Sequence, residues 1–124
     1  SPGGASSGFL PASERSRPLA FKSLGEVGSM LGSAGVVVLN DTVDMRAAVM
    51  SQLRFFEAES CGQCAPCRIG TRYLRTALDQ RIAGNRNGSA ADELAHVADA
   101  AWQMNEGSIC GLGQAAPLPL TLAL

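Results

Sequence analysis

The chain has 124 residues, a hydrophobic content of 46% and a formal net charge of −1 at pH 7. This length allows one domain, or one domain with a piece of another, and the apolar content suffices for a compact core. The near-neutral charge gives no footprint for nucleic acid, and no apolar run approaches the roughly 20 residues that span a bilayer, so we expect neither nucleic-acid binding nor membrane insertion.

Residues 1–40 are rich in glycine and irregular in pattern. A β-branched run predicts a short buried strand over residues 35–40. A brief helix is predicted over residues 23–31 by three apolar residues at helical spacing, Leu24, Val27 and Leu31. This part is too small to be a complete domain, and the chain begins without Met. We therefore expect both ends to be cut from a longer protein.

From Asp41 onward the pattern is helical. Asp41 can cap a helix that ends near Ser60, with one apolar stripe formed by Met45, Val49, Leu53 and Phe56. A second helix is predicted over residues 68–83 and stops at Gly84. Its inward side chains are expected to be Ile69, Tyr73, Leu74, Ala77, Leu78 and Ile82.

Residues 84–88 predict a turn, and a third helix follows over residues 90–106. Ser89 caps it, with Asp92 three residues on in a near capping box, and Gly107 ends it. Its apolar positions are Leu94, Val97, Ala98 and Ala101. Pro117 suits the first turn of a fourth helix. Three to four antiparallel helices would make a small bundle over residues 41–124.

The four cysteines are placed unevenly. Cys61, Cys64 and Cys67 follow a C-x2-C-x2-C pattern, and Cys110 stands far along the chain. A compact run of this kind with one remote cysteine is typical of [4Fe–4S] ligation. The second and third predicted helices have similar lengths and a short turn between them, so the chain that leaves Cys67 should return to the same level at Cys110.

Two other interpretations of the cysteines agree less well with their spacing. Structural zinc sites use two separated cysteine pairs more often than three equally spaced cysteines and a remote one. Disulfide pairing would leave one of the three crowded cysteines without a partner. The spacing therefore favours an iron–sulfur cluster, with a structural zinc-binding helical interaction module as the alternative.

Two segments give a specific resemblance. The string ESCGQCAPCRIGT, residues 59–71, resembles the cluster loop of the NADH-binding flavoprotein subunit of respiratory complex I. Its relatives include the diaphorase subunit of NAD-reducing hydrogenases and the beta subunit of NAD-dependent formate dehydrogenases. SICGLGQAAP, residues 108–117, resembles the second cluster segment of this family. GGASSG, residues 3–8, and SMLGSAG, residues 29–35, are similar to its ubiquitin-like (SLBB) domain.

The resemblance implies an α+β fold, with the C-terminal part of a ubiquitin-like (SLBB) domain over residues 1–40 and an iron–sulfur-binding helical bundle over residues 41–124. It also implies that a [4Fe–4S] cluster relays electrons between FMN and a partner iron–sulfur subunit of an NADH:acceptor oxidoreductase. Its ligands would be Cys61, Cys64, Cys67 and Cys110.

The flavin and NAD(H) sites of this family lie in the N-terminal part of the same subunit. This chain shows no glycine-rich fingerprint for them, because Gly111 and Gly113 follow no strand and a third glycine is lacking. The resemblance implies a cytoplasmic location, peripheral to the inner membrane as part of a larger complex.

Several other residues carry expectations of their own. Arg68 and Arg72 share a helix face, where they could favour the reduced cluster or remain solvated. We expect His96 to face solvent, and Glu57 and Glu59 to form a solvated helix edge. The aromatic side chains expected in the core are Phe55, Phe56, Tyr73 and Trp102.

Overall fold

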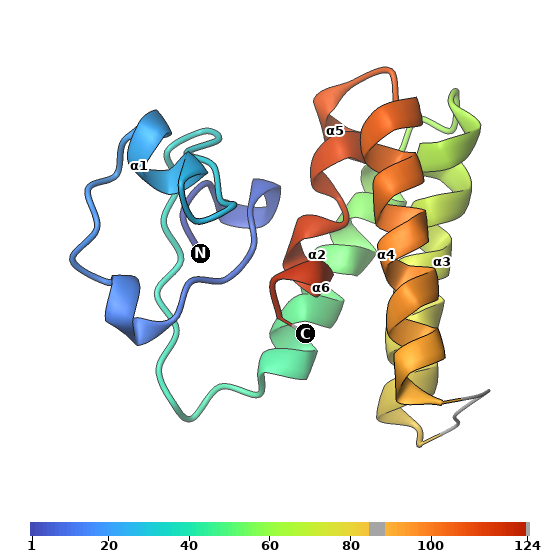
Figure 1. Cartoon of the computed structure of the whole chain (residues 1–124), viewed down its shortest axis with the longest axis horizontal. Helices are drawn as coiled ribbons and strands as arrows, with labels where there is room; N and C mark the ends of the chain where they lie inside the picture. Colours follow the sequence, from blue (N-terminus) through green and yellow to red (C-terminus); the bar gives the residue numbers. More distant parts are fainter. Residues whose placement is uncertain (85–88, 124) are drawn as a thin grey trace.

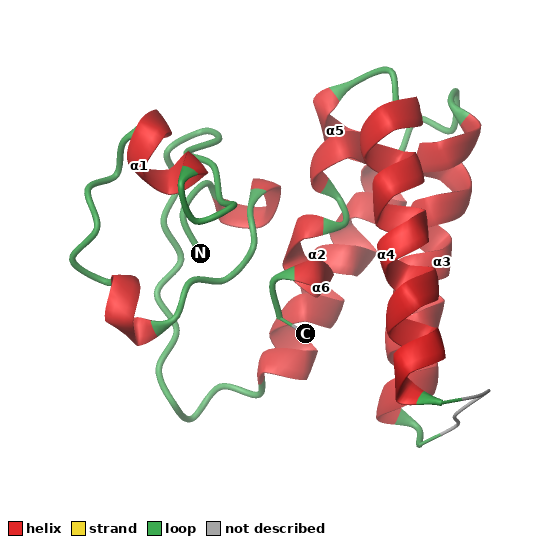
Figure 2. Cartoon of the chain, in the orientation of Figure 1, coloured by secondary structure: helices red, strands yellow, loops and turns green. Residues whose placement is uncertain are grey.

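The computed structural model describes residues 1–84 and 89–123 (Figure 1). Residues 1–44 form an irregular part, and the rest form a helical bundle that lies beside it (Figure 2). The helical elements of the described residues are η1 (Gly4–Ser6), η2 (Ala12–Glu14), α1 (Phe21–Gly25), α2 (Met45–Glu59), α3 (Ala65–Ile82), α4 (Ala90–Gly107), α5 (Gly111–Ala115) and α6 (Leu118–Thr121).

The described residues contain no strand, so the expectation of an α+β fold is corrected to a mostly helical one. The predicted strand over residues 35–40 is an extended segment with a single antiparallel bridge, between Pro2 and Val36. The backbone N–H of Val37 also donates to the carbonyl of Ser1 at 3.0 Å, but Val38 is 86% exposed. An extended segment becomes a strand only when a neighbour continues the ladder. Here only residues 1–4 pair with it, the last contact being the backbone N–H of Gly4 to the carbonyl of Gly35 at 3.1 Å, and left-handed φ values at Gly3 and Gly4 end the pairing.

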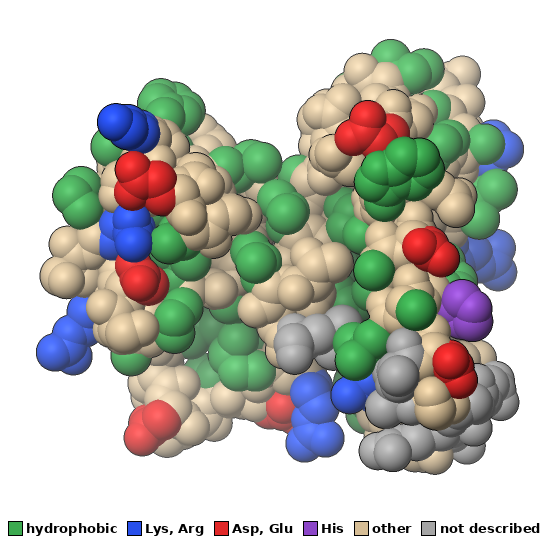
Figure 3. Space-filling model, in the orientation of Figure 1, with side chains coloured by type: hydrophobic (Ala, Val, Ile, Leu, Met, Phe, Trp, Pro, Cys, Tyr) green, Lys and Arg blue, Asp and Glu red, His purple; other side chains and the backbone are tan. Residues whose placement is uncertain are grey.

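The short helix of the irregular part is also displaced from its predicted position. It occupies Phe21–Gly25 instead of residues 23–31, because the chain turns at Gly28, whose φ of +69° is left-handed. Leu24 is fully buried, and Arg17 pairs with Glu14 and Glu26 across this part. Figure 3 shows acidic and basic side chains alternating over this side of the molecule.

Helix α2 begins four residues later than its predicted cap. Asp44, not Asp41, is the N-cap, and its carboxylate accepts the backbone N–H of Arg46 at 2.9 Å. Capping needs a side-chain oxygen within reach of the second or third helical amide, and only Asp44 has that register. The predicted stripe is buried at Val49, Leu53 and Phe56, with Met50 beside it, whereas Met45 at the first helical position is exposed.

Helices α3 and α4 lie side by side and form the hairpin that the sequence predicts (Figure 1). Each has 18 residues, and at about 1.5 Å per residue each is about 27 Å long. The capping box at Ser89 and Asp92 is confirmed, since each residue's backbone N–H donates to the other's side-chain oxygen at 3.2 Å. Within the predicted turn over residues 84–88, Gly84 has a left-handed φ of +75°, and residues 85–88 lie outside the described residues.

The inward face of α3 differs from the predicted one. Leu74 and Leu78 are buried, but Ile69 is 63% exposed, and Tyr73 and Ile82 are exposed too. The buried face keeps Leu74 and Leu78 of the predicted stripe but continues through residues that the prediction left out: Cys67, Gly70 and Thr71. This face includes a glycine and a threonine, because α4 packs closely there, so counting large apolar residues alone misplaces the face.

The burial predicted for the aromatic residues and for the apolar positions of α4 is confirmed only in part. Phe56 is buried as predicted, whereas Phe55 and Tyr73 are exposed and Trp102 is 67% exposed. In α4, Val97 is buried and Ala101 half-buried, but Leu94 and Ala98 are exposed. His96 faces solvent as expected, and the one histidine side chain is visible at the surface in Figure 3.

The C-terminal segment closes the core. After α5, Pro117 stands at the N-cap of α6, next to the first-turn position that the sequence predicted for a fourth helix. Helix α6 packs against α2 and α4, and the buried side chains of all these helices form one cluster. Among the described residues, no helix combines the length and apolar character needed to cross a membrane.

Candidate metal centre

The cysteine loop runs from the end of α2 to the start of α3. Ser60 ends α2 in an extended conformation, and Gly62 has a left-handed φ of +75°, which favours glycine. Cys64 is the N-cap of α3, and Pro66 lies in the first turn, where its missing N–H costs nothing. Helix α3 therefore starts at Ala65, three residues before its predicted start, and Cys67 lies inside its first turn.

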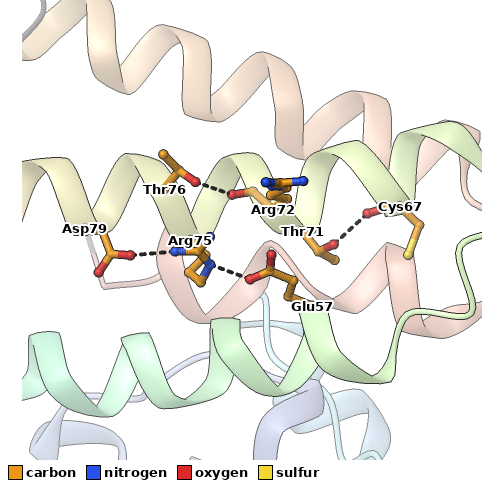
Figure 4. A network of polar contacts seen from close by, with 7 residues as sticks. All are labelled: Glu57, Cys67, Thr71, Arg72, Arg75, Thr76 and Asp79. Atoms are coloured by element: carbon orange, nitrogen blue, oxygen red, sulfur yellow. Dashed lines mark hydrogen bonds and ion pairs between the residues drawn. The ribbon is translucent and has the colours of Figure 1, made fainter.

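Cys67 is the most enclosed of the four cysteines, with 4% of its surface exposed. The hydroxyl of Thr71 donates to the carbonyl of Cys67 at 2.9 Å, one turn further along α3 (Figure 4). Ser60 Oγ lies 3.4 Å from Cys67 Sγ. Both contacts fix this cysteine at the point where the loop joins the helix.

The segment that carries Cys110 lies against the start of α3. A Cβ added to Gly107, at the end of α4, would stand 2.8 Å from Cγ of Pro66. A Cβ added to Gly113, in α5, would stand 2.9 Å from Cβ of Cys67. The segment on either side of Cys110 therefore touches the first turn of α3, as the hairpin argument predicted.

The pKa values of two thiols reflect this proximity. The pKa of Cys64 is lowered from its ordinary value, chiefly by a hydrogen bond from the backbone of Ile109, next to Cys110. Burial raises the pKa of Cys67, against the hydrogen bond from Ser60, and the neighbouring Cys64 and Cys110 raise it further. The contacts with Ile109 and Cys110 cross the hairpin, so Cys64, Cys67 and Cys110 are neighbours.

Cys61 and Cys110 are exposed, Cys64 is half-buried, and all four cysteines are free thiols. Across residues 1–84 and 89–123, no group of three or more His, Cys, Asp or Glu side chains is arranged to hold a metal ion. A cluster spreads its cysteines over several irons, so its ligands lie further apart.

The residues fit an iron–sulfur group by their chemistry. Soft thiolates are the ligands that such clusters take, and three cysteines come together where the start of α3 meets the junction of α4 and α5. The hydroxyl of Ser108, which is 6% exposed, has no hydrogen-bond partner within the described residues. A polar atom of this kind, buried beside Cys67, fits a site whose acceptor is a sulfur-rich group.

Charged residues hold the loop and the helices around it. The Arg68 guanidinium donates to the carbonyl of Gly62 at 2.8 Å, so Arg68 braces the loop. Arg75 of α3 pairs with Glu57 of α2 and, at 2.6 Å, with Asp79 of its own helix (Figure 4). Glu57 is therefore an ion-pair partner and not a solvated edge, although Glu59 is exposed as expected.

Sequence reasoning missed several residues of this centre. Arg75 carried no expectation, and Ser60 appeared only as a helix end. Ser108 and Gly113 appeared only within the segment that resembles the second cluster segment of the family, with no role of their own. An i,i+4 pairing of Arg75 with Asp79 is visible in the sequence, but the contact with Glu57 joins two helices. The serine and glycine positions have no sequence signal, because their importance comes from what packs across the hairpin.

Known proteins resemble this chain over most of its length. The family model of the NADH-ubiquinone oxidoreductase-F iron–sulfur binding region matches residues 47–124. A subunit of the NADH-quinone oxidoreductase of Rickettsia akari is 38% identical over 119 residues, which are 96% of this chain and 27% of that protein. The mitochondrial NADH dehydrogenase [ubiquinone] flavoprotein 1 of Dictyostelium discoideum is 38% identical over 120 residues, which are 96% of this chain and 24% of that protein.

A solved structure resembles it as well. A crystal structure of an NAD⁺-reducing [NiFe]-hydrogenase in the H₂-reduced state superimposes with a TM-score of 0.81 at 33% identity. The match covers 97% of this chain and 20% of that chain, so the chain spans about a quarter or less of the proteins that it matches. The family model is that of a 4Fe–4S region, which supports the cofactor that the cysteine spacing predicted. The chain belongs to the family of the NADH-ubiquinone oxidoreductase-F iron–sulfur binding region.

Proposed function

We propose that this chain holds a [4Fe–4S] cluster with Cys61, Cys64, Cys67 and Cys110, and that it relays electrons between FMN and a partner iron–sulfur subunit. The observation that carries the proposal is the return of the chain around Cys110 to Cys64 and Cys67. Membership of an iron–sulfur binding family supports it. When bound, the cluster supplies one-electron transfer at a potential set by its surroundings.

The chain's own residues have distinct tasks in this proposal. Cys67 is the inner anchor, held by its place in α3 and by the Thr71 hydroxyl. Arg68 and Gly62 keep the loop folded back toward the helix, so that Cys61 and Cys64 stay near it. Cys110 is presented by the junction of α4 and α5, and closing the site this way excludes water from one side of Cys67.

We infer that the parent protein is an NADH:acceptor oxidoreductase of the kind for which the relatives are named. Those names cover NADH-quinone oxidoreductase, NADH dehydrogenase and NAD⁺-reducing hydrogenase, and the sequence resemblance adds NAD-dependent formate dehydrogenase. FMN and NAD(H) would bind in the N-terminal part of the same subunit. The subunit would join partner iron–sulfur subunits in a cytoplasmic complex peripheral to the inner membrane. Residues 1–40 would belong to a ubiquitin-like (SLBB) domain and residues 41–124 to the cluster bundle.

Metal and sulfide analysis tests the proposal directly. Protein prepared without oxygen should contain about four iron and four sulfide per chain and absorb broadly in the visible range. Reduction should give a low-temperature EPR signal of a reduced [4Fe–4S] centre. Stoichiometric zinc without sulfide would instead identify a structural zinc module and overturn the proposal.

A further inference from the structure

Two serines from different parts of the chain lie beside Cys67. Ser60, at the end of α2, places its Oγ 3.4 Å from Cys67 Sγ, and it accepts the backbone N–H of Gly62, also at 3.4 Å. The hydroxyl oxygen thus already has a donor, which leaves its own proton free for the sulfur. A cysteine that binds iron has lost its proton, so in this contact the serine is the donor.

Ser108 approaches the same cysteine from the end of α4. The point where a Gly113 Cβ would stand is 2.3 Å from Ser108 Oγ and 2.9 Å from Cys67 Cβ. Ser108 is more than nine-tenths buried, and its hydroxyl lacks a partner among the residues that the structure describes. Buried hydroxyls are nearly always hydrogen-bonded, because leaving one unpaired costs free energy.

We propose that Ser60 donates a hydrogen bond to Cys67 Sγ, that Ser108 donates one to a sulfide of the cluster bound beside it, and that both thereby raise the reduction potential of the centre. The inference rests on the proposed function, since it needs a cluster held at this cysteine. Reduction adds one electron and therefore one negative charge, which spreads over the sulfurs. A hydroxyl aimed at a sulfur stabilises that added charge, so it favours the reduced form, and its proton stays on the serine throughout.

A purely structural role makes a different prediction. Ser60 ends α2 and accepts the Gly62 amide, so it could serve only to shape the loop. Ser108 could serve only to fill space beside Gly113. Roles of that kind would change the stability of the fold or the yield of cluster, but would leave the potential of an assembled cluster unchanged.

Potentiometric titration followed by EPR separates the two roles. It compares S60A, S108A and the native protein, each as the cluster-loaded chain within its longer subunit. Each alanine substitution should lower the midpoint potential by up to about 59 mV. For one electron this corresponds to a tenfold lower ratio of reduced to oxidised cluster at a given potential. The control is S29A, because Ser29 is also buried without a hydroxyl partner among the described residues but lies in the irregular part of the chain. It should leave the midpoint unchanged.

A matched pair isolates the hydroxyl of Ser60 from its shape. Thr and Val have the same size, and only Thr retains the hydroxyl, so S60T should keep the native midpoint and S60V should lower it. If S60A does not assemble a cluster, this pair decides the question for Ser60. Equal midpoints, or equal loss of the cluster, in S60T and S60V would overturn the proposal.

The outcomes also distinguish this inference from the proposed function. If the native protein carries a cluster but neither S60A nor S108A moves its midpoint, this inference alone fails. If the native protein carries zinc without sulfide, the proposed function fails and the inference fails with it.

Discussion

Replacing Gly113 with alanine should damage the centre without touching a cysteine. An added Cβ would stand 2.3 Å from Ser108 Oγ, 2.6 Å from Ser108 Cβ and 2.9 Å from Cys67 Cβ. Real Cβ contacts are not this short. Ser108 Oγ could rotate away, but the Cβ atoms of Ser108 and Cys67 are fixed by the backbone. Either α5 shifts outward or Cys67 moves, and overpacking of this kind costs about 1–3 kcal/mol.

Gly111 provides the matched control in the same short helix. A Cβ there would meet nothing within 4 Å, and neither glycine has a left-handed φ. Alanine in place of glycine favours a helix by roughly 0.5–1 kcal/mol at either position. G111A should therefore be neutral or slightly stabilising, and G113A should be less stable than G111A by about 1–3 kcal/mol.

Urea unfolding of the two variants gives this difference, and iron and sulfide analysis gives the effect on the centre. We expect G113A to hold less iron or to lose it faster to a chelator, because the clash displaces Cys67 or the segment that carries Cys110. If G113A matches G111A in both stability and iron content, the close approach of α5 to Cys67 is not what closes the site.

Four further results are expected. C110S should keep the bundle folded by circular dichroism, because Cys110 is exposed, but should give a labile or three-iron cluster; a full, air-stable cluster with unchanged EPR would exclude Cys110 as a ligand. L74A should lower the free energy of unfolding by about 2–5 kcal/mol, because Leu74 is fully buried. I69A should stay within about 0.5 kcal/mol of the native protein, and equal urea midpoints for the two variants would show that Ile69 is buried after all. The hydrogen bonds from Ser89, and then the charge of His96, lower the pKa of Asp92 in the folded protein. The contribution of Asp92 to stability is therefore complete above the ordinary carboxyl pKa and is lost as pH falls through the lower folded value. The difference in urea midpoint between the native protein and D92N should shrink in acid. The chain alone should not oxidise NADH, because it lacks a glycine-rich phosphate loop; NADH–ferricyanide activity comparable with that of an intact flavoprotein would contradict this.

The sequence predicted best where a local rule was sufficient. The capping box at Ser89 needs only its own residues, and α4 ends at Gly107 as predicted. The hairpin was predictable because two helices of similar length and a short connection leave little choice of return path. The proximity of Cys110 to Cys67 follows from that geometry.

The predictions that were wrong depended on contacts between distant segments. The β-branched run over residues 35–40 has strand propensity, but only Ser1, Pro2 and Gly4 pair with it, so propensity alone did not make a strand. Ile69 is apolar and has helical spacing, yet the buried row of α3 passes through Gly70 and Thr71. No pattern of large apolar residues reveals a face that is buried because its residues are small.

Small residues also explain why the site closes where it does. A Cβ at Gly70 would stand 2.3 Å from Sδ of Met104, one at Gly107 would stand 2.8 Å from Cγ of Pro66, and one at Gly113 would overlap Ser108. All three glycines lie at the cysteine end of the bundle, where α3 meets the end of α4 and α5. Larger side chains there would hold the two segments apart, and Cys110 would no longer approach Cys67. The helices therefore determine that the chain returns to the level of Cys67, and the glycines determine how closely it returns.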